Sequence, residues 1–347
     1  MSIISGISPL KHRLRLLTSY LRRSSVCPGL PITGIIATTH RCNMSCQMCI
    51  RRVRSFDGPD MDLNLFKKII DEWIPHLRFL SLDGPGETTM YPDAFQMIRY
   101  AKSNGIRIVF STNATLLDGG MADEIIDSGV DLITFSMNAV TPGLYKAIHG
   151  CDRYQEALEN IYGFLARKIE RHAPILVSLQ MIRLPETLPQ IGAFYRKWQQ
   201  VPGVDFVRVK QDVVQNRNFQ PKEARLSTKR RTPCSRLWHG PLYIETNGDV
   251  YASPGVLYKA GPIGNLRKES LAGVWNCKKI QAMRRAHLRK DLSAFHECVR
   301  CAYPRPLLPL VLSGFLLDPF LAGKFIPLTE KLAFWHHFPL YEKDSRH

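Results

Sequence analysis

Short β-branched and apolar runs alternate along the chain with longer stretches in which apolar residues recur at helical spacing. This alternation begins near residue 34 and is typical of βα units on a parallel sheet. The expected strands are 34–38, 79–82, 107–110, 132–136, 175–181 and 206–209. The expected helices lie near 62–74, 92–104, 119–128, 154–171 and 187–200. Six strands predict an α/β fold with a partial (β/α)6 barrel, fewer than the eight units of a complete TIM barrel.

The pattern changes after residue 209. A basic, irregular stretch leads to two apolar runs, 242–245 and 250–252, which are joined by Asn247 and Gly248. Asn-Gly between two such runs predicts a β-hairpin. A helix at about 269–288 follows, so we place a boundary near residue 215. The expected parts are an N-terminal segment 1–32, a core barrel 33–215, a smaller domain 216–304 and an apolar tail 305–347.

Composition excludes several classes of protein. With 347 residues, of which 45% are hydrophobic and 22% charged, the chain can bury a sizeable core and is neither disordered, collagenous nor a coiled coil. The net charge of +17 suits an anionic partner such as nucleic acid, a phospholipid surface or a phosphorylated substrate. Residues 1–54 and 278–290 hold basic side chains and no acidic ones. Each segment is therefore either a solvated surface or a contact with an anionic partner.

The chain shows no sign of a secretory signal or of a membrane span. The basic N-terminus lacks a continuous apolar run with a small-residue cleavage site. The most apolar stretch, 306–317, is interrupted by Pro309 and Gly314 and is shorter than the roughly 20 residues of a transmembrane helix. We therefore expect a cytoplasmic protein.

Residues 9–23 predict a basic amphipathic helix. Four leucines share one of its faces, and five Lys or Arg residues lie elsewhere: Leu10, Leu14, Leu17 and Leu21, with Lys11, Arg13, Arg15, Arg22 and Arg23. Such a helix either packs across the bottom of the barrel or lies on an anionic bilayer. The tail from residue 305 to 341 either caps the protein or adds to an apolar patch for lipid contact or dimerisation. Peripheral association with the inner face of a membrane is therefore one hypothesis.

Nine cysteines occur, and five of them lie in two tight groups. Cys42, Cys46 and Cys49 follow the first strand with C-x3-C-x2-C spacing, and Cys298 and Cys301 form C-x2-C. Clustered thiols in a chain of this length indicate metal or redox chemistry rather than a disulfide framework. Three thiolates in one loop can hold an iron-sulfur cluster and leave one iron position open.

Glycine-rich or short polar segments follow the next three strands. They are Gly84-Pro85-Gly86-Glu87, Ser111-Thr112-Asn113 and Ser136-Met137-Asn138. The carboxyl ends of parallel strands meet at one mouth of a barrel, where ligands bind. We therefore expect these three segments to lie beside the triple cysteine.

The segments together resemble the motifs of the radical SAM superfamily over roughly residues 33–210. The triple cysteine resembles the family's cluster loop, and residues 84–87 resemble its Gly-Gly-Glu-Pro loop. Residues 112–117 resemble its Thr-Asn-Gly-Thr-Leu-Leu segment, and residues 136–138 its Ser-Ile-Asp segment. The chain departs from the family at Met48, where an aromatic residue is usual, at Thr88, where proline is usual, and at Ala114, where glycine is usual.

The resemblance implies a 4Fe-4S cluster bound by Cys42, Cys46 and Cys49, with S-adenosylmethionine (SAM) on its fourth iron. Reductive cleavage then gives a 5′-deoxyadenosyl radical that removes a hydrogen atom from substrate. The implied SAM contacts are Gly84 and Gly86 for the methionine moiety, Glu87 for the ammonium group, Ser136 and Asn138 for ribose or carboxylate, and Asn113, for which an ordinary strand-end turn is the alternative. An external donor such as flavodoxin or ferredoxin supplies the electron.

The second cysteine group resembles the SPASM or twitch extension of the same superfamily, in which a β-hairpin and a helix hold auxiliary iron-sulfur clusters. The matched ligands are Cys234, Cys298 and Cys301. Ser253 stands where the family usually has a further cysteine. The resemblance therefore implies one auxiliary 4Fe-4S cluster with an open iron, and a degenerate or lost cluster is the alternative.

We predict a radical SAM enzyme with a small twitch-like extension, acting on a lipid or other anionic small molecule. A radical SAM maturase acting on a peptide or RNA is the first alternative, although no nucleic-acid motif is recognisable. The second alternative is a zinc-binding structural or nucleic-acid protein, in which His40 is the nominal fourth ligand beside the triple cysteine. Fold alone does not select the reaction type.

Overall fold

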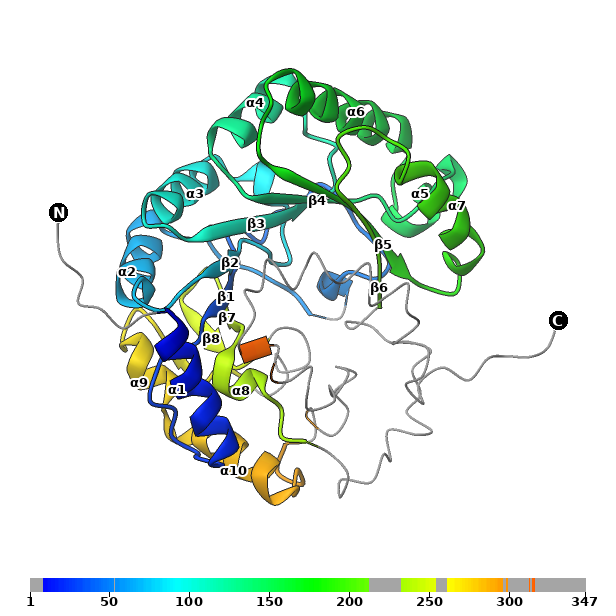
Figure 1. The fold of residues 1–347 in the computed structure, drawn as a ribbon. Coiled ribbons are helices and arrows are strands. Elements are labelled where there is room, and N and C mark those ends of the chain that lie inside the picture. Colours follow the sequence, from blue (N-terminus) through cyan, green and yellow to red (C-terminus); the bar gives the residue numbers. More distant parts are fainter. Residues whose placement is uncertain are drawn as a thin grey trace, which may run out of the picture.

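The computed structural model describes residues 9–52, 54–211, 232–253 and 261–295, together with Cys298, Leu312, Gly314 and Phe315. Figure 1 shows a curved sheet with helices on its outer side. The predicted tail 305–347 lies outside the described residues apart from those last three, and so does Cys301. Within the described residues, no helix combines the length and apolar character needed to cross a bilayer.

Six parallel strands pair in chain order and form the barrel wall. They are β1 (Thr33–Ile36), β2 (Phe79–Ser81), β3 (Arg107–Thr112), β4 (Leu132–Ser136), β5 (Leu176–Arg183) and β6 (Phe206–Gln211). All six predicted strands are confirmed, with ends that differ by a few residues. This is a partial (β/α)6 TIM-like barrel.

The predicted hairpin extends the same sheet. Its strands are β7 (Leu242–Ile244) and β8 (Asp249–Tyr251), which pair antiparallel, and β9 (Gly264–Asn265) pairs with β8. Since β7 pairs in parallel with β1, the sheet order in the described part of the chain is β6-β5-β4-β3-β2-β1-β7-β8-β9. The C-terminal extension is therefore joined to the barrel along the strand that leads into the triple cysteine.

The helices between the strands cover the outer face of the sheet (Figure 1). They are α2 (Leu63–Trp73), α3 (Asp93–Ser103), α4 (Gly119–Asp127), α5 (Pro142–His149), α6 (Tyr154–Glu170) and α7 (Ile191–Trp198), with short 3-10 turns η1 (Ile50–Arg52), η2 (Thr88–Met90) and η3 (Leu188–Gln190). The predictions include all of these α-helices except α5. Later helices are α8 (Arg236–His239), α9 (Leu271–Trp275) and α10 (Lys278–Arg289).

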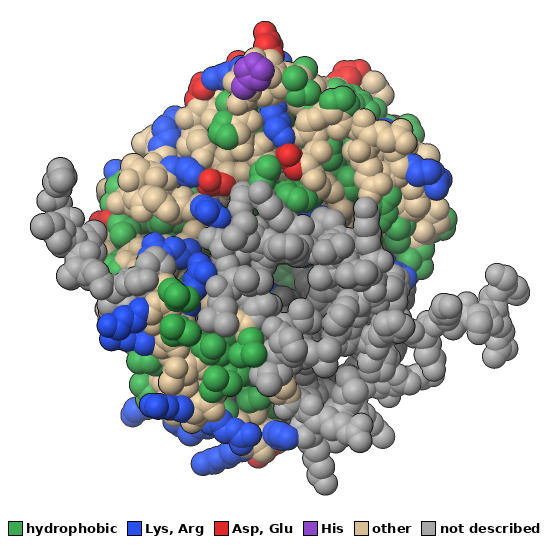
Figure 2. All heavy atoms as spheres, viewed as in Figure 1, with side chains coloured by type: hydrophobic (Ala, Val, Ile, Leu, Met, Phe, Trp, Pro, Cys, Tyr) green, Lys and Arg blue, Asp and Glu red, His purple; other side chains and the backbone are tan. Residues whose placement is uncertain are grey.

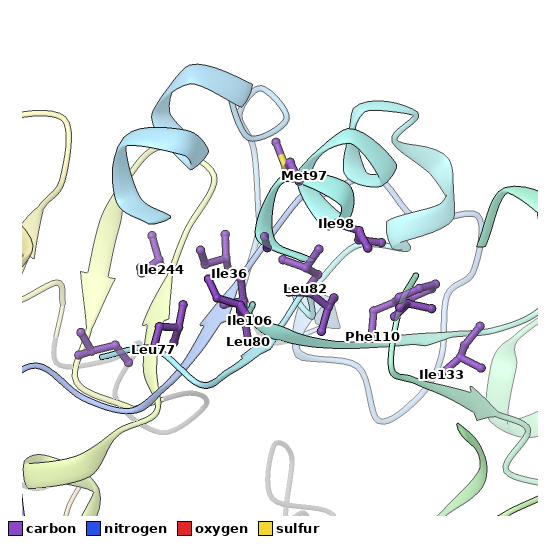
Figure 3. Close-up of a cluster of buried hydrophobic side chains, with 14 of the residues drawn as sticks. Ile36, Leu77, Leu80, Leu82, Met97, Ile98, Ile106, Phe110, Ile133 and Ile244 are labelled. Carbon is purple, nitrogen blue, oxygen red and sulfur yellow. The ribbon is translucent and has the colours of Figure 1, made fainter. Parts of the chain in front are cut away.

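Strand side chains alternate between the two faces of the sheet. On the outer face, Ile36, Leu80 and Phe110 pack with side chains of α3 such as Ile98 in the main core (Figure 3). On the inner face, Ile35, Ala37, Tyr243 and Tyr251 form a separate small cluster. β1 and the hairpin are therefore packed together on both faces.

A glycine in β1 admits the largest side chain of α2. A Cβ on Gly34 would lie 2.4 Å from the Trp73 ring, which is fully buried. The Trp73 indole Nε1 also donates to the Pro31 carbonyl at 2.7 Å. Trp73 thus fixes α2 against the start of β1, and any side chain at residue 34 would displace the indole.

The N-terminal helix α1 (Pro9–Leu21) packs at the amino end of the barrel strands. The His12 ring stacks on His76 with centroids 4.0 Å apart, and its Nε2 lies 2.8 Å from the Leu30 carbonyl. Tyr20 donates from its hydroxyl to the Pro233 carbonyl at 3.0 Å and contacts the Trp238 ring edge-on. One face of α1 therefore packs against the protein, as the first of its two predicted alternatives requires.

The single helix predicted at about 269–288 is wrong, because the chain is interrupted between α9 and α10. The Asn276 side chain bonds both the backbone N–H and the carbonyl of Cys27 at 2.9 Å. Cys277 is extended and begins α10. This contact with a residue 249 positions earlier carries no local sequence signal, so helical periodicity did not reveal the interruption.

Candidate active site

The cluster loop, residues 38–49, follows β1 and is held by backbone contacts with neighbouring loops. The Gln47 amide donates to the Ile148 carbonyl at 2.8 Å. A Cβ on Gly150 would lie 2.9 Å from the Ser45 carbonyl oxygen, and Gly150 has a positive φ of 72°. Glycine is therefore required at residue 150 for the loop after α5 to pack against the cluster loop.

The loop after β2 packs against the same segment from the other side. A Cβ on Gly86 would lie 2.2 Å from the Thr39 carbonyl oxygen, and the Glu87 amide donates to the Arg41 carbonyl at 2.7 Å. A Cβ on Gly84 would lie 2.8 Å from that of Ala37. In this structure the two glycines bring residues 84–87 against the chain that leads to Cys42.

The Glu87 carboxylate connects the second and third strand-end loops. Its Oε2 accepts from the Asn113 backbone N–H at 2.8 Å, and its Oε1 accepts from the Thr89 hydroxyl at 2.9 Å. Burial raises the pKa of the Glu87 carboxyl, although these hydrogen bonds act in the opposite direction. The side chain is thus fixed, buried and close to the mouth of the barrel.

An amide network links the third loop to the cluster loop. Asn113 donates from Nδ2 to the Asn43 Oδ1 at 2.9 Å, and its own Oδ1 accepts from the Thr115 hydroxyl at 2.7 Å. Asn43 donates in turn to the Thr115 hydroxyl at 2.8 Å. Ala114 has a left-handed backbone with φ of 64°, which explains why related proteins use glycine at that position.

The loop after β4 contains Ser136 and Asn138, which differ in their burial and contacts. Ser136 is half-buried at the carboxyl end of β4. Asn138 is fully buried; its Oδ1 accepts from the Ile182 amide at 2.7 Å and its Nδ2 lies 3.4 Å from the ring of His149. Asn138 therefore fixes the β4 end to β5 and to α5, and Ser136 is the more accessible of the two.

His149, at the end of α5, contacts the cluster loop directly. Its Nδ1 lies 3.2 Å from the Cys46 Sγ, and its Nε2 lies 3.2 Å from the Met137 carbonyl. Its ring stacks on Tyr145 with centroids 4.2 Å apart. Burial lowers the pKa of His149 to about 4, so the ring is neutral. Burial also raises the pKa of the Cys46 thiol to about 12, with Cys49 and Cys42 adding to the effect.

The three thiols of the cluster loop fit an iron-sulfur cluster by their chemistry and surroundings. Cys42, Cys46 and Cys49 form no disulfide and are half-buried, and the nearby Met44 and Met48 are buried. Among the described residues no group of three His, Cys, Asp or Glu is placed to hold one metal ion. That finding is neutral for a 4Fe-4S cluster, because its three thiolates bind three different iron atoms.

A buried polar pair joins the cluster loop to the hairpin. The His40 Nε2 lies 2.7 Å from a carboxylate oxygen of Glu245, which directly follows β7. Both side chains are buried. This contact makes the cluster loop dependent on the C-terminal extension.

The second cysteine group is described in part. Cys234 lies just before α8, where its amide N–H faces the Nδ1 of His287 at 3.4 Å, and Cys298 is buried. The Ser253 hydroxyl accepts from Arg236 Nη1 at 3.3 Å. Cys277 donates from its thiol to the Ile263 carbonyl at 3.2 Å, a contact that suits a structural thiol.

Two residues at the cluster loop were not among the predicted site residues. Asn43 lies within the triple-cysteine motif itself, between Cys42 and Cys46. His149 lies on α5, which Thr141 as N-cap, Pro142 in the first turn and Gly150 at the C-terminus signal in the sequence. Those capping signals could have revealed the helix, but nothing local indicates that its last residue contacts Cys46.

Two family models match the chain. The model of the radical SAM superfamily matches residues 36–196, and the model of the SPASM iron-sulfur cluster-binding domain matches residues 234–302. Together the matches cover about two thirds of the sequence. The chain belongs to the radical SAM superfamily and has a SPASM domain at its C-terminal side.

Curated relatives align over limited spans. A tungsten-containing aldehyde ferredoxin oxidoreductase cofactor-modifying protein of Pyrococcus furiosus is 40% identical over 104 residues, which are 29% of this chain and 29% of that protein. A Fe-coproporphyrin III synthase of Methanosarcina barkeri is 25% identical over 148 residues, 42% of this chain and 37% of that protein. A mycofactocin maturase of Mycobacterium ulcerans is 27% identical over 144 residues, 40% of this chain and 39% of that protein. The alignments thus span well under half the length of these relatives.

Solved structures share the fold. Streptococcus suis SuiB bound to precursor peptide SuiA has a TM-score of 0.58 and 14% identity, with 78% of this chain and 69% of that chain covered. The enzyme anSMEcpe with bound AdoMet has a TM-score of 0.56 and 11% identity, with 84% and 97% covered. At such identities the likeness concerns the fold alone.

Membership in the superfamily decides between the alternatives for the cysteines. The radical SAM domain is of a type that uses a 4Fe-4S cluster and SAM, and the SPASM domain is of a type that binds iron-sulfur clusters. The alternative of a zinc-binding structural protein is therefore set aside. When bound, the reduced cluster supplies one electron to the sulfonium of SAM and so generates a carbon radical.

Proposed function

We propose that Cys42, Cys46 and Cys49 hold the catalytic cluster and that the enzyme removes a hydrogen atom from an anionic small molecule at the mouth of the barrel. The observation that carries this proposal is the convergence of four loops. The cluster loop touches the loops after β2 and α5 through backbone contacts and the loop after β3 through Asn43. Such pre-formed geometry keeps thiolates and cofactor contacts in place before either ligand binds.

The proposed SAM contacts differ in how the protein already uses them. Glu87 is the proposed partner of the ammonium group, since it is a carboxylate held beside the cluster loop. Ser136 is the proposed contact for ribose or carboxylate. Gly84 and Gly86 act by letting their loop pack closely against the chain that leads to Cys42, since neither has a side chain. Asn113 and Asn138 act mainly by fixing loops to one another.

The inner face of the barrel supports an anionic and polar substrate. Strand alternation places Asp83, Ser178, Arg208 and Lys210 on that face, because Leu82, Val177, Val207 and Val209 belong to the outer core. Arg208 and Lys210 bring two positive charges to this face, and Asp83 brings one negative charge. The excess of positive charge favours a phosphate or carboxylate group on the substrate.

Two other substrates remain alternatives of this proposal. A peptide is favoured by the name of one relative, the PqqA peptide cyclase of Bradyrhizobium diazoefficiens, and by the precursor peptide bound to one structural neighbour, SuiB. A lipid-linked substrate, with the protein held at the inner face of a membrane, is favoured by the exposed leucines of α1. The polar inner face of the barrel argues for a headgroup rather than an acyl chain as the reacting part.

We further propose that Cys234, Cys298 and Cys301 hold one auxiliary cluster, whose open iron accepts an electron from the substrate radical or binds substrate. The proposal is supported by the matched SPASM domain and by the three thiols that the sequence offers. The electron for the SAM cluster comes from an external donor of the flavodoxin or ferredoxin kind. Both clusters require a reducing compartment such as the cytoplasm.

The experiment is anaerobic reconstitution with iron and sulfide, followed by dithionite and SAM. Reductant-dependent 5′-deoxyadenosine, measured by chromatography, is the expected result. About eight irons per chain are expected for two cubane clusters, and about four would remove the auxiliary cluster from the proposal. Incubation with phosphorylated, peptide and lipid-linked candidates then selects the substrate class, because the true substrate increases 5′-deoxyadenosine formation. Absence of cleavage would contradict the proposed site.

A further inference from the structure

Helix α1 carries a second apolar face that is exposed among the residues that the structure describes. Leu16, Leu17 and Tyr20 are buried against the barrel and α8. Leu10, Leu14 and Leu21 lie at i, i+4 and i+11 on the neighbouring arc of the helix and are 55%, 45% and 55% exposed. Three large leucines on one short helix are an unusual concentration of exposed apolar surface.

Basic side chains surround these leucines. On and just after α1, Lys11, Arg15, Arg22 and Arg23 are exposed, and the helix contains no acidic residue. Helix α10 also contains no acidic residue and exposes Lys278, Arg285 and Arg289. In Figure 2, hydrophobic side chains lie over α1, and Lys and Arg side chains lie around them and along α10.

The two helices are fixed beside one another. The buried Arg284 of α10 donates from Nη1 to the Ser25 carbonyl at 3.0 Å, and Arg285 contacts the Ser25 hydroxyl at 3.5 Å. Ser25 follows α1 by four residues, so α10 holds its basic face next to the end of α1. We define the α1–α10 face as the exposed leucines Leu10, Leu14 and Leu21 with the exposed Lys and Arg residues of both helices.

The α1–α10 face lies away from the candidate active site. His12 holds α1 near Leu30 and His76, which precede β1 and β2. The cluster loop instead follows the carboxyl end of β1. A partner on the α1–α10 face would therefore leave the mouth of the barrel open.

We propose that the α1–α10 face docks the enzyme on an anionic phospholipid bilayer. An apolar stripe bordered by cations suits the boundary between acyl chains and anionic headgroups. A second copy of the chain fits less well, because a two-fold pairing would bring two basic borders together. Nucleic acid would use the cations but would leave the three leucines in water. This inference goes beyond the radical chemistry and does not depend on the substrate.

The test is co-sedimentation with phosphatidylglycerol–phosphatidylcholine vesicles and with pure phosphatidylcholine vesicles at low salt. Binding to the anionic vesicles and loss of that binding in 0.5 M salt are expected. Replacing Arg15 and Arg22 by Gln should weaken binding about fivefold per cation. The double variant Leu14→Ser, Leu21→Ser should weaken it by roughly tenfold or more, because each leucine inserts part of its apolar area.

Matched controls lie elsewhere on the surface. Leu188 is 45% exposed, like Leu14, and Leu188→Ser should bind vesicles as the wild type does. Lys146→Gln controls for the loss of charge at an exposed site. All variants should keep their circular dichroism spectrum and their SAM cleavage. Equal binding to both vesicle types, or equal binding by the leucine variant and wild type, would overturn the proposal. Leucine-dependent dimers without vesicle binding would assign the face to a second copy instead.

Discussion

The cluster loop and the C-terminal cysteine group are the two regions that we propose to bind iron, and their supports differ. The cluster loop is braced by backbone contacts from the loops after β2 and α5. In the described part of the C-terminal group, Cys234 precedes a helix of four residues and Ser253 bonds an arginine. The cluster loop is held by strand-end loops of the barrel, whereas the described part around Cys234 contacts α1 and α10, through Tyr20 to the Pro233 carbonyl and through His287 to the Cys234 amide.

Departures from the family motifs have different consequences in the two regions. Met48 is buried with Ile148 and Leu184, and the Thr88 hydroxyl donates to the Leu82 carbonyl at 2.9 Å. Both substitutions keep the loops in place without supplying a ligand. Ser253, in contrast, stands where the family resemblance implies a cysteine ligand, so we expect it to change the coordination itself.

Replacing one thiol in each region gives the largest expected difference. Cys46→Ala should lower 5′-deoxyadenosine formation by more than roughly 1,000-fold, or about 4 kcal/mol, because two thiolates do not retain the catalytic cluster. Cys298→Ala should lose the auxiliary iron but retain part of the SAM cleavage, uncoupled from substrate. Chromatography of 5′-deoxyadenosine and iron analysis on the same samples measure both effects.

Cys277→Ala is the control for these variants, since its thiol bonds a backbone carbonyl. It should keep both the iron content and the cleavage rate. Full cleavage by the Cys46 variant would show that the catalytic cluster lies elsewhere. Equal loss of cleavage in the Cys46 and Cys298 variants would remove the functional distinction between the two regions.

Arg284→Met tests how α10 is fastened to α8 and to the segment that follows α1. The guanidinium is fully buried, donates to the carbonyls of Leu237, Ser25 and Trp275, and lies over the Trp275 ring at 4.7 Å. Burial lowers the pKa of Arg284 to about 10. Removing it leaves several buried acceptors without donors, so the free energy of unfolding should fall by about 3 kcal/mol.

Urea denaturation followed by tryptophan fluorescence measures that loss. The exposed neighbour Arg285 provides the matched control, and Arg285→Met should change the free energy of unfolding by less than about 0.5 kcal/mol. Equal midpoints for the two variants would show that Arg284 contributes no more to the free energy of unfolding than a surface residue does.

Glu87→Gln isolates the charge of the one carboxylate that we propose for the SAM ammonium group. It keeps the shape of the side chain but loses the charge-assisted contact, so SAM binding should weaken by about 1.5 to 3 kcal/mol. Calorimetric titration of the reconstituted enzyme measures the change. Glu124→Gln, in an exposed pair with Arg99, is the control. Unchanged affinity in the Glu87 variant would move the ammonium contact to another group.

The sequence predicted the strands well because each is an apolar run between turn residues. β4 agrees at both ends, and the Asn247-Gly248 hairpin is present. The four loops that the motifs singled out do converge at one end of the sheet. Periodicity missed α5, which has only eight residues, and it did not reveal that Asn276 interrupts the last helical region.

The missing parts of the site depend on contacts between distant residues. His149 lies 103 positions from Cys46, and Glu245 lies 205 positions from His40. No spacing rule connects such pairs, because the fold brings them together. Motifs therefore identified the proposed ligands, whereas the residues that hold the cluster loop against α5 and β7 required the structure.

Ser253→Cys gives the smallest expected effect and bears most directly on the difference between the two regions. The Arg236 guanidinium, 3.3 Å from the present hydroxyl, would lie beside the new thiol and favour its thiolate form. A fourth thiolate should close the open iron and slow the loss of auxiliary iron to a chelator several-fold, while uncoupled SAM cleavage stays unchanged. Ser103→Cys, an exposed thiol on α3, is the control and should leave the rate of iron loss as it is. Iron release followed by absorbance distinguishes the outcomes. Faster release from the Ser253 variant than from the wild type would mean that the serine and its arginine stabilise the auxiliary site as it stands.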